Sequence, residues 1–320
     1  MIILKLGDIY RSSIEIGMKN DPRGYDEVLE RLNEKKSEFN ELTEEKKEEF
    51  DQESLSNPYG DTRLLYGDIE REIEIILTGI DVDVGEILLA DRLREKGLSN
   101  ILVLAHHPTS TGLTGLYEVM DLQNDMLASF GVPINVAEKL MKDRIEEVQR
   151  GLLSSNNNRA LDAARLLDVP LMCCHTPADN CGNKFVERKI DQANPRTVKD
   201  VMRILKEIPE YQESMRRKTG PELIVGKSTD RAGKVVVEFT GGTSGSSKIY
   251  EKLAQAGVGT IVTMHMREDH RKLAKEHHLN VIIASHICSD SLGMNIILDE
   301  FEKKQVKIES FSGFYRVSRA

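Results

Sequence analysis

From about residue 60 onward, short apolar runs alternate with longer amphipathic segments. Several of the runs are continuous and rich in β-branched residues, as in strands buried on both faces. The predicted strands are Ile73–Ile80, Ile101–Ala105, Leu171–Cys174, Leu223–Val225, Val235–Phe239, Thr260–Thr263, Val281–Ala284 and Val306–Phe311. The predicted helices are Val84–Lys96, Leu116–Phe130, Ile134–Leu153, Arg159–Leu167, Thr197–Glu207, Ser246–Ala256, Glu268–His277 and Leu292–Lys303. This alternation predicts an α/β fold with largely parallel strand pairing.

The first 60 residues have a different pattern. Between residues 25 and 53 the chain contains neither Gly nor Pro, and its apolar residues follow alternating steps of three and four, with Lys35 interrupting the series. Such spacing predicts a helix with one narrow apolar stripe, here Tyr25, Val28, Leu32, Phe39 and Leu42. We expect a solvated helix packed along one edge of the body. The alternative is a helical protrusion that mediates contacts between subunits.

The charge is concentrated in this same segment. The 320 residues carry a formal net charge of −9, and residues 21–53 hold 13 acids and 6 bases, so the other 287 residues are close to neutral. A pI near 5.5 argues against a general surface for nucleic acids or anionic membranes. No stretch approaches the ~18 apolar residues of a membrane span. The N-terminus lacks signal-peptide features and four Cys form no disulfide framework, so we expect a cytoplasmic protein.

Histidines stand at the ends of three predicted strands. Ligand sites in open α/β sheets lie beyond the carboxyl ends of strands, and Pro108 stops the strand before it. Neutral imidazoles mixed with carboxylates suit Zn, Mn, Fe or Co. The residues are His106 and His107 after the second predicted strand, His175 and Asp179 after the third, and His286 and Asp290 after the seventh. Their repeated placement predicts a metal site.

Each group taken alone has a simpler explanation. A single His is more often structural than a ligand, and a His followed four residues later by Asp recurs by chance. The adjacent Cys173 and Cys174 would face apart in a strand and belong to no C-x-x-C motif, so we interpret them as small apolar core residues. The metal-site prediction therefore depends on the three groups occurring together.

A glycine-rich stretch separates the strand at 235–239 from the next helix. Its glycines would let backbone N–H groups point at a phosphate, although it matches neither the P-loop nor the dinucleotide fingerprint. A tight turn with Ser as the helix cap explains it equally well. Nearby, His265 and His270 flank a short acidic stretch and either line the same cleft or cap a helix. The loop consists of Gly241, Gly242, Thr243, Ser244 and Gly245.

Together these motifs resemble the NIF-three-like family, also named the GTP cyclohydrolase I type 2 family, over about residues 60–320. The resemblance rests on the order of the Asp81 region, the His106-His107-Pro108 motif, His175-Thr176 with Asp179, the glycine-rich loop, the run 263–270, and His286 with Asp290. It implies two intertwined α/β/α repeats with mixed, largely parallel sheets and assembly into a homohexamer. The corresponding division is an acidic helical segment at 1–60, a first repeat at 61–195 and a second at 196–320, with the site at their junction.

The resemblance also implies a ligand set for two divalent metal ions, which would be Zn, Fe, Mn or Co. The ligands would be His106, His107, Asp179, His286 and Asp290, with His175, His265 and His270 as orienting or cleft residues. The chain departs from the family, which usually has Glu at position 290 and Gly at position 285. The expected function is hydrolysis of a small phosphorylated or nucleotide-like substrate. A metal-stabilised scaffold or regulatory protein is the alternative, because no Lys or Arg accompanies the histidines in their motifs.

Overall fold

The computed structural model describes residues 4–320, so the first three residues of the predicted N-terminal segment lie outside it. Five strands form the larger sheet: β2 (Arg63–Tyr66), β4 (Ile75–Gly79), β5 (Ile101–Ala105), β6 (Leu171–Cys173) and β11 (Lys307–Ser310). Their order is β11-β4-β5-β6-β2, with parallel pairing throughout except between β2 and β6. The chain therefore returns to its first sheet with its last strand.

The second sheet has the same mixed character. It contains β7 (Glu222–Val225), β8 (Lys234–Glu238), β9 (Val258–Thr263) and β10 (Asn280–Ile283) in the order β7-β10-β9-β8. β8, β9 and β10 are parallel, and β7 is an antiparallel edge strand. Mixed, largely parallel sheets confirm the predicted α/β fold. The strands of the larger sheet precede the predicted boundary at 195/196, except β11, and the strands of the smaller sheet follow it.

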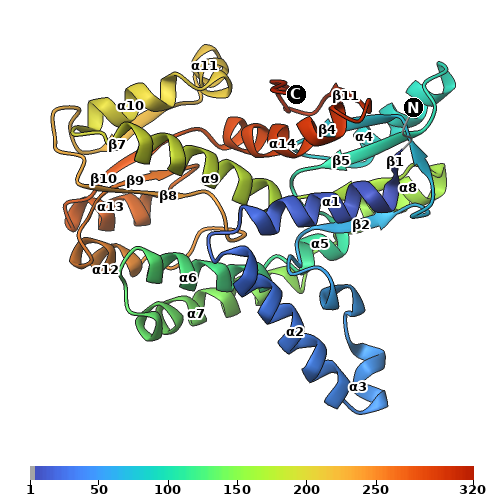
Figure 1. Cartoon of the computed structure of the whole chain (residues 1–320), viewed down its shortest axis with the longest axis horizontal. Coiled ribbons are helices and arrows are strands. Elements are labelled where there is room, and N and C mark those ends of the chain that lie inside the picture. Colours follow the sequence, from blue (N-terminus) through green and yellow to red (C-terminus); the bar gives the residue numbers. More distant parts are fainter. Residues whose placement is uncertain (1–3) are drawn as a thin grey trace.

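Two long helices, α9 (Thr176–Ala193) and α14 (His286–Glu302), pack closely against each other and cover one face of both sheets (Figure 1). The first half of α9 packs on the larger sheet, and its second half packs on the smaller one. α14 runs the opposite way, from the smaller sheet to the larger. Each helix thus begins at a strand end of one sheet and ends against the other sheet.

The approach of α9 to α14 depends on glycine. A Cβ atom at Gly293 would lie 2.1 Å from the carbonyl oxygen of Ala178, so any larger residue would collide with backbone. A second close approach joins α9 to α1 (Leu6–Lys19), where a Cβ at Gly17 would lie 2.5 Å from Pro177. These contacts fix the start of α9 against its two neighbours.

The outer faces of the sheets are covered by the remaining helices. On the larger sheet these are α4 (Val84–Glu95) and α8 (Arg159–Leu167). On the smaller sheet they are α6 (Leu122–Ser129), α7 (Ile134–Leu152), α12 (Ile249–Gln255) and α13 (Glu268–Glu276). The other short elements are β1 (Leu4–Lys5), β3 (Glu72–Ile73), α5 (Ser110–Thr114), α10 (Val198–Lys206), α11 (Pro209–Arg216) and the 3-10 turns Gln52–Leu55 and Glu118–Asp121.

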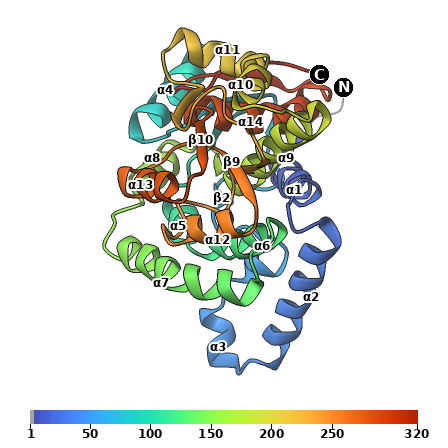
Figure 2. The same cartoon turned by 90° about the vertical axis from the view of Figure 1, so that its left-hand side faces the viewer.

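The acidic segment is two helices rather than the single helix that its pattern predicts. α2 (Tyr25–Glu41) ends before Thr43, and α3 (Glu44–Glu49) turns back, so that the rings of Phe39 and Phe50 meet at 4.9 Å. Val28 and Leu32 are buried against the body, as expected for a helix packed along one edge. Beyond them the helix pair projects away from the body (Figure 2). Its role in subunit contacts stays a prediction.

All eight predicted strands are present, with ends shifted by a few residues. The predicted helix at 116–130 is divided into a 3-10 turn and α6, and the helix at 246–256 begins only at Ile249. The pattern missed α1, α11, β2 and all of α9, and it placed the start of α14 six residues late. Over the described residues, no helix is long and apolar enough to cross a membrane.

Candidate metal centre

His106 and His107 follow directly from the end of β5. The backbone N–H of His106 donates to the carbonyl of Gly79 and that of His107 to Ile80, both at 2.9 Å, so the chain still runs beside the exit of β4. The two rings lie 5.2 Å apart and lean toward the same space. His106 is buried, and the His107 side chain is 26% exposed.

The other two groups lie on the first turns of the helix pair. His175 caps α9 and Asp179 lies one turn later, while His286 begins α14 and Asp290 lies one turn later. Because residues four apart share a helix face, each His and its Asp point the same way. The residue before His286, Ser285, has φ 135°, a backbone conformation that favours glycine. The three predicted groups therefore meet where the two helices leave strands of different sheets.

Asp290 lies at the centre of this cluster. Its carboxylate oxygens are 3.6 Å from His106 Nε2, 3.6 Å from His107 Nε2 and 3.8 Å from His286 Nε2. His106 Nε2 is also 3.5 Å from Asp179 Oδ1. A metal ion sits about 2.0–2.2 Å from nitrogen and oxygen ligands, so the ligand atoms of one ion lie roughly 3–3.5 Å apart. The observed separations are close to those that a shared ion requires.

The same atoms lack hydrogen bonds within the described chain. His106 Nε2, Asp179 Oδ1 and both carboxylate oxygens of Asp290 are buried and have no hydrogen-bond partner among residues 4–320. Buried polar atoms are costly unless they are paired or bind a metal. Three groups of ligand atoms each lie within 4.8 Å of one another: His106 with His107 and His175, His107 with His286 and Asp290, and His106 with Asp179 and Asp290. These residues fit a metal ion by chemistry as well as by distance.

Three imidazoles are held through their Nδ1 atoms, which leaves Nε2 facing the cluster. His106 Nδ1 lies 3.2 Å from the carbonyl of Cys174, and His107 Nδ1 lies 2.7 Å from Asp81 Oδ1. His175 Nδ1 lies 2.8 Å from Asp61 Oδ2. A carbonyl or carboxylate on the far nitrogen is the usual support of a metal-binding His, because it fixes the tautomer and the ring orientation.

Asp61 is a buried residue behind the cluster that the sequence did not reveal. It is fully buried, and besides His175 it accepts a 2.6 Å hydrogen bond from the Thr176 hydroxyl. It lies in the loop before β2, far from the other motifs, and no strand or helix periodicity marks it. Only the fold brings this loop against the start of α9.

Asp61→Asn should weaken metal binding by about 10–100-fold. The amide lacks the negative charge of the carboxylate that accepts the hydrogen bonds from His175 and Thr176. A titration against a chelator of known affinity measures the change. Asp162→Asn, which removes the same charge from the exposed face of α8, is the matched control. An affinity within twofold of the wild type would show that Asp61 does not support the site.

Burial and charge set the protonation of the cluster. Burial lowers the pKa of His106 to about 4, so this imidazole is neutral at pH 7 and its Nε2 lone pair is available. Burial also acts to lower the pKa of His175, but Asp179 and Asp61 outweigh it and raise this pKa to about 9. Burial, reinforced by Asp290, raises the pKa of Asp179 well above its ordinary value. A bound cation would replace the protons that His175 and Asp179 retain.

The remaining predicted residues lie beside the cluster. The His265 ring lies 4.9 Å from that of His286, and His270 is set further back, where its Nδ1 pairs with the Tyr250 hydroxyl at 2.9 Å. In the glycine-rich loop, the carbonyls of Gly241 and Thr243 accept hydrogen bonds from Gln123. Cys173 and Cys174 are buried and belong to none of the ligand groups, as the sequence predicts for core residues.

No protein-family model and no curated protein sequence matches the chain. Among solved structures, it is similar to the NIF3 superfamily protein from Sphaerobacter thermophilus, with 25% identity and a TM-score of 0.70. That match covers 80% of this chain and 92% of the other. The reduced HcgD protein from Methanocaldococcus jannaschii is similar in fold, with 17% identity, a TM-score of 0.50, and coverage of 83% and 94%.

Proposed function

Because this chain is a NIF3-like protein, we propose that its cluster of histidines and aspartates binds two divalent metal ions and hydrolyses a small phosphorylated or nucleotide-like substrate. The observation that carries the proposal is the pair of ligand groups that share Asp290. His106 and Asp179 lie on one side of this carboxylate, and His107 and His286 lie on the other. One ion on each side would be bridged by it.

Two adjacent divalent ions supply an activated water and stabilise charge on the leaving oxygen of a phosphate or similar group. The protein residues divide into a buried and an accessible set. His106, Asp179 and Asp290 are buried, whereas His107 and His286 have side chains that are 26% and 38% exposed. The open side of the cluster is therefore the side of His107 and His286. A substrate would approach there.

In this proposal the glycine-rich loop would receive a phosphate group of the substrate. Its carbonyls at Gly241, Thr243 and Ser244 are turned toward Gln123 and Arg144, which donate hydrogen bonds to them. The Ser244 hydroxyl lies 3.4 Å from His265 Nδ1, on the side of the metal ligands. Arg144 is a cation next to the loop, and its guanidinium also forms an ion pair with Glu147 at 2.8 Å.

The hydrolase proposal predicts two metals per chain and turnover that depends on them. Protein loaded with Zn, Mn, Fe or Co should contain close to two equivalents by elemental analysis and should hydrolyse at least one of a panel of phosphate monoesters, phosphodiesters and nucleotides. His286→Ala should lose both the second equivalent and the turnover, while His277→Ala, at the half-buried C-cap of α13, should lose neither.

A metal-loaded protein without turnover on the whole panel would favour the non-catalytic scaffold instead. A single equivalent of metal would contradict the bridged arrangement. The homohexamer expected from the resemblance is part of this proposal, and a mass measurement in solution tests it. In that assembly the projecting α2 and α3 would be available for contacts between subunits.

A further inference from the structure

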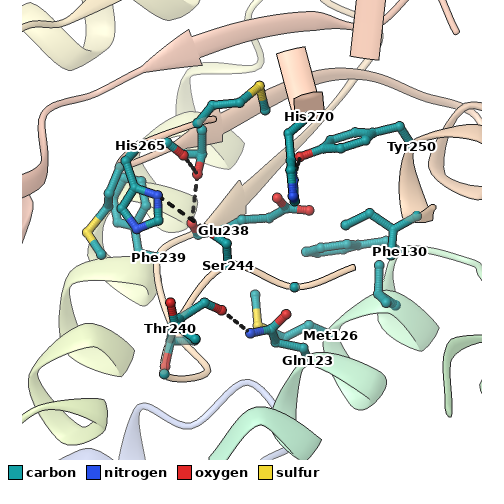
Figure 3. Close-up of a pocket in the computed structure, with 18 residues that line it drawn as sticks. Gln123, Met126, Phe130, Glu238, Phe239, Thr240, Ser244, Tyr250, His265 and His270 are labelled. Carbon is teal, nitrogen blue, oxygen red and sulfur yellow. Dashed lines mark hydrogen bonds between the residues drawn. The ribbon is translucent and has the colours of Figure 1, made fainter. Parts of the chain in front are cut away.

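A cavity of about 740 Å³, counted with its open mouth, lies beside the metal cluster between the smaller sheet and α6 and α12. Its walls combine apolar and aromatic side chains with a few polar groups (Figure 3). Phe130 and Met126 come from the end of the α6 region, and Tyr250 comes from α12. The cavity is separate from the ligand groups, and nothing in the proposed hydrolysis uses its inner part.

The inner part contains a carboxylate without a partner. Glu238 ends β8 and points into the cavity between the side chains of His270 and Tyr250 and those of Phe130 and Met126 (Figure 3). Among residues 4–320, no group donates a hydrogen bond to this carboxylate or forms an ion pair with it, and burial alone raises its pKa to about 7. The side chain is half-buried and lines an open cavity, so a donor or a cation from a ligand can reach the carboxylate.

A hydroxyl donor lines the same cavity. Arg267 Nη2 lies 3.3 Å from His270 Nε2 and, as a guanidinium, can only donate, so the proton of this neutral imidazole is on Nδ1. Burial lowers the pKa of His270, which agrees with the neutral form. Nδ1 then donates to the Tyr250 oxygen at 2.9 Å, and the Tyr250 O–H is left to donate into the cavity.

The cavity reaches the metal cluster through one side chain. His265 and Ser244 are among the residues that line the cavity, and the centre of the His265 ring lies 4.9 Å from that of the His286 ring. A molecule held at Glu238 that extends past His265 would reach the glycine-rich loop and the His286 side of the cluster. This arrangement suits a substrate with a flat head and a phosphate-bearing tail.

We propose that the cavity binds the non-reacting end of the substrate, and that this end is a flat nitrogen heterocycle with two adjacent N–H donors, which pair with the two carboxylate oxygens of Glu238. The inference relies on the proposed function only for what the other end of the substrate is. Binding of the heterocycle in the cavity does not depend on that function. Two parallel N–H···O bonds satisfy both oxygens at once, which a single amine cannot do with the same geometry. The aromatic rings of Phe130 and Tyr250 offer apolar surfaces for a flat ring.

Binding of two matched compounds tests this assignment. 2-Aminobenzimidazole carries the adjacent N–H pair, and benzimidazole has the same ring without the amino group. Calorimetric titration of the full chain should show 2-aminobenzimidazole binding at least tenfold more tightly. Titration after treatment with a chelator, as well as with metal loaded, separates the cavity from direct coordination of a ring nitrogen to a metal.

Glu238→Gln should remove this preference, because an amide offers only one acceptor oxygen beside a donor NH₂. Glu222→Gln, on the exposed side of β7 in the same sheet, should retain it. Phe130→Leu, which removes an aromatic wall and leaves Glu238 in place, should weaken both compounds by a similar factor and provides a second test if Glu238→Gln fails to fold. Melting curves establish the folded state of each variant.

The outcomes separate this inference from the proposed hydrolysis. A tenfold preference that depends on Glu238 in metal-free protein supports the cavity assignment even if no substrate of the panel is hydrolysed. Equal binding of the two compounds, or a preference that survives Glu238→Gln, overturns the assignment even if the metal-loaded protein is a hydrolase. Loss of the preference on metal removal alone also overturns it, since the compound would then be a metal ligand.

Discussion

Asp290→Asn should reduce metal affinity by about 100-fold or more, a larger loss than any other single substitution in the cluster should cause. Removal of a residue that only supports a metal ligand already lowers metal affinity by about 10–100-fold. Asp290 belongs to two of the ligand groups, so its loss should cost more. The amide retains one oxygen but loses the charge and the second acceptor that bridging needs. Equilibrium dialysis followed by elemental analysis measures the metal that remains bound.

The substitution should leave the metal-free protein folded. Asn has nearly the same shape as Asp, and the carboxylate that it replaces is fully buried with no hydrogen-bond partner in the described chain. We therefore expect the melting temperature of the metal-free variant to stay within about 4 °C of the wild type, or to rise. Glu300→Gln, exposed on the same helix, should change neither property. Full metal content in Asp290→Asn would refute the ligand assignment.

Gly293→Ala should destabilise the protein by about 1–3 kcal/mol, and more if the helices cannot separate. The added Cβ would lie 2.1 Å from a backbone oxygen of α9, which no change of side-chain rotamer can relieve. The two helices must then move apart, and with them Asp179 and Asp290. Chemical denaturation of the metal-free protein measures the stability, and chelator competition measures the accompanying loss of metal affinity.

Gly182→Ala is the matched control for this prediction. It lies on α9 and also faces α14, but its Cβ would meet the nearest atom, the carbonyl oxygen of Ser289, at 3.4 Å, which is ordinary contact. The variant should lose less than about 1 kcal/mol, since Ala favours the helix more than Gly does. If both substitutions cost the same free energy, close packing at Gly293 is not what positions the two carboxylates.

The strands could be predicted because β-branched runs buried on both faces have a distinct composition. The start of α9 could not, because the residues from Thr176 to Asn183 include Pro, Gly and two Asn and are almost all buried. Such a segment has poor helix propensity and no polar face, so neither composition nor periodicity indicates a helix. The first turns of α14 were missed for the same reason.

Those missed turns carry Asp179 and Asp290, so the sequence predicted the members of the cluster without showing how they meet. The spacing of four residues between each His and its Asp was compatible with a helix or with a tight turn, and only the helices place both pairs on facing surfaces. Glu238 lies within a predicted strand and Asp61 in a loop, and both depend on tertiary neighbours that no local pattern specifies.

The return of β11 to the first sheet has a consequence for the synthesis of the protein. Domains generally fold from the N-terminus as the chain emerges, but here β4 has only one of its two neighbouring strands, β5, until residues 307–310 have been made. The candidate ligands His286 and Asp290 are also synthesised late, on the helix just before that strand. A nascent chain thus lacks the complete cluster, and under the proposed function the full set of ions would be acquired only by a polypeptide that is nearly finished.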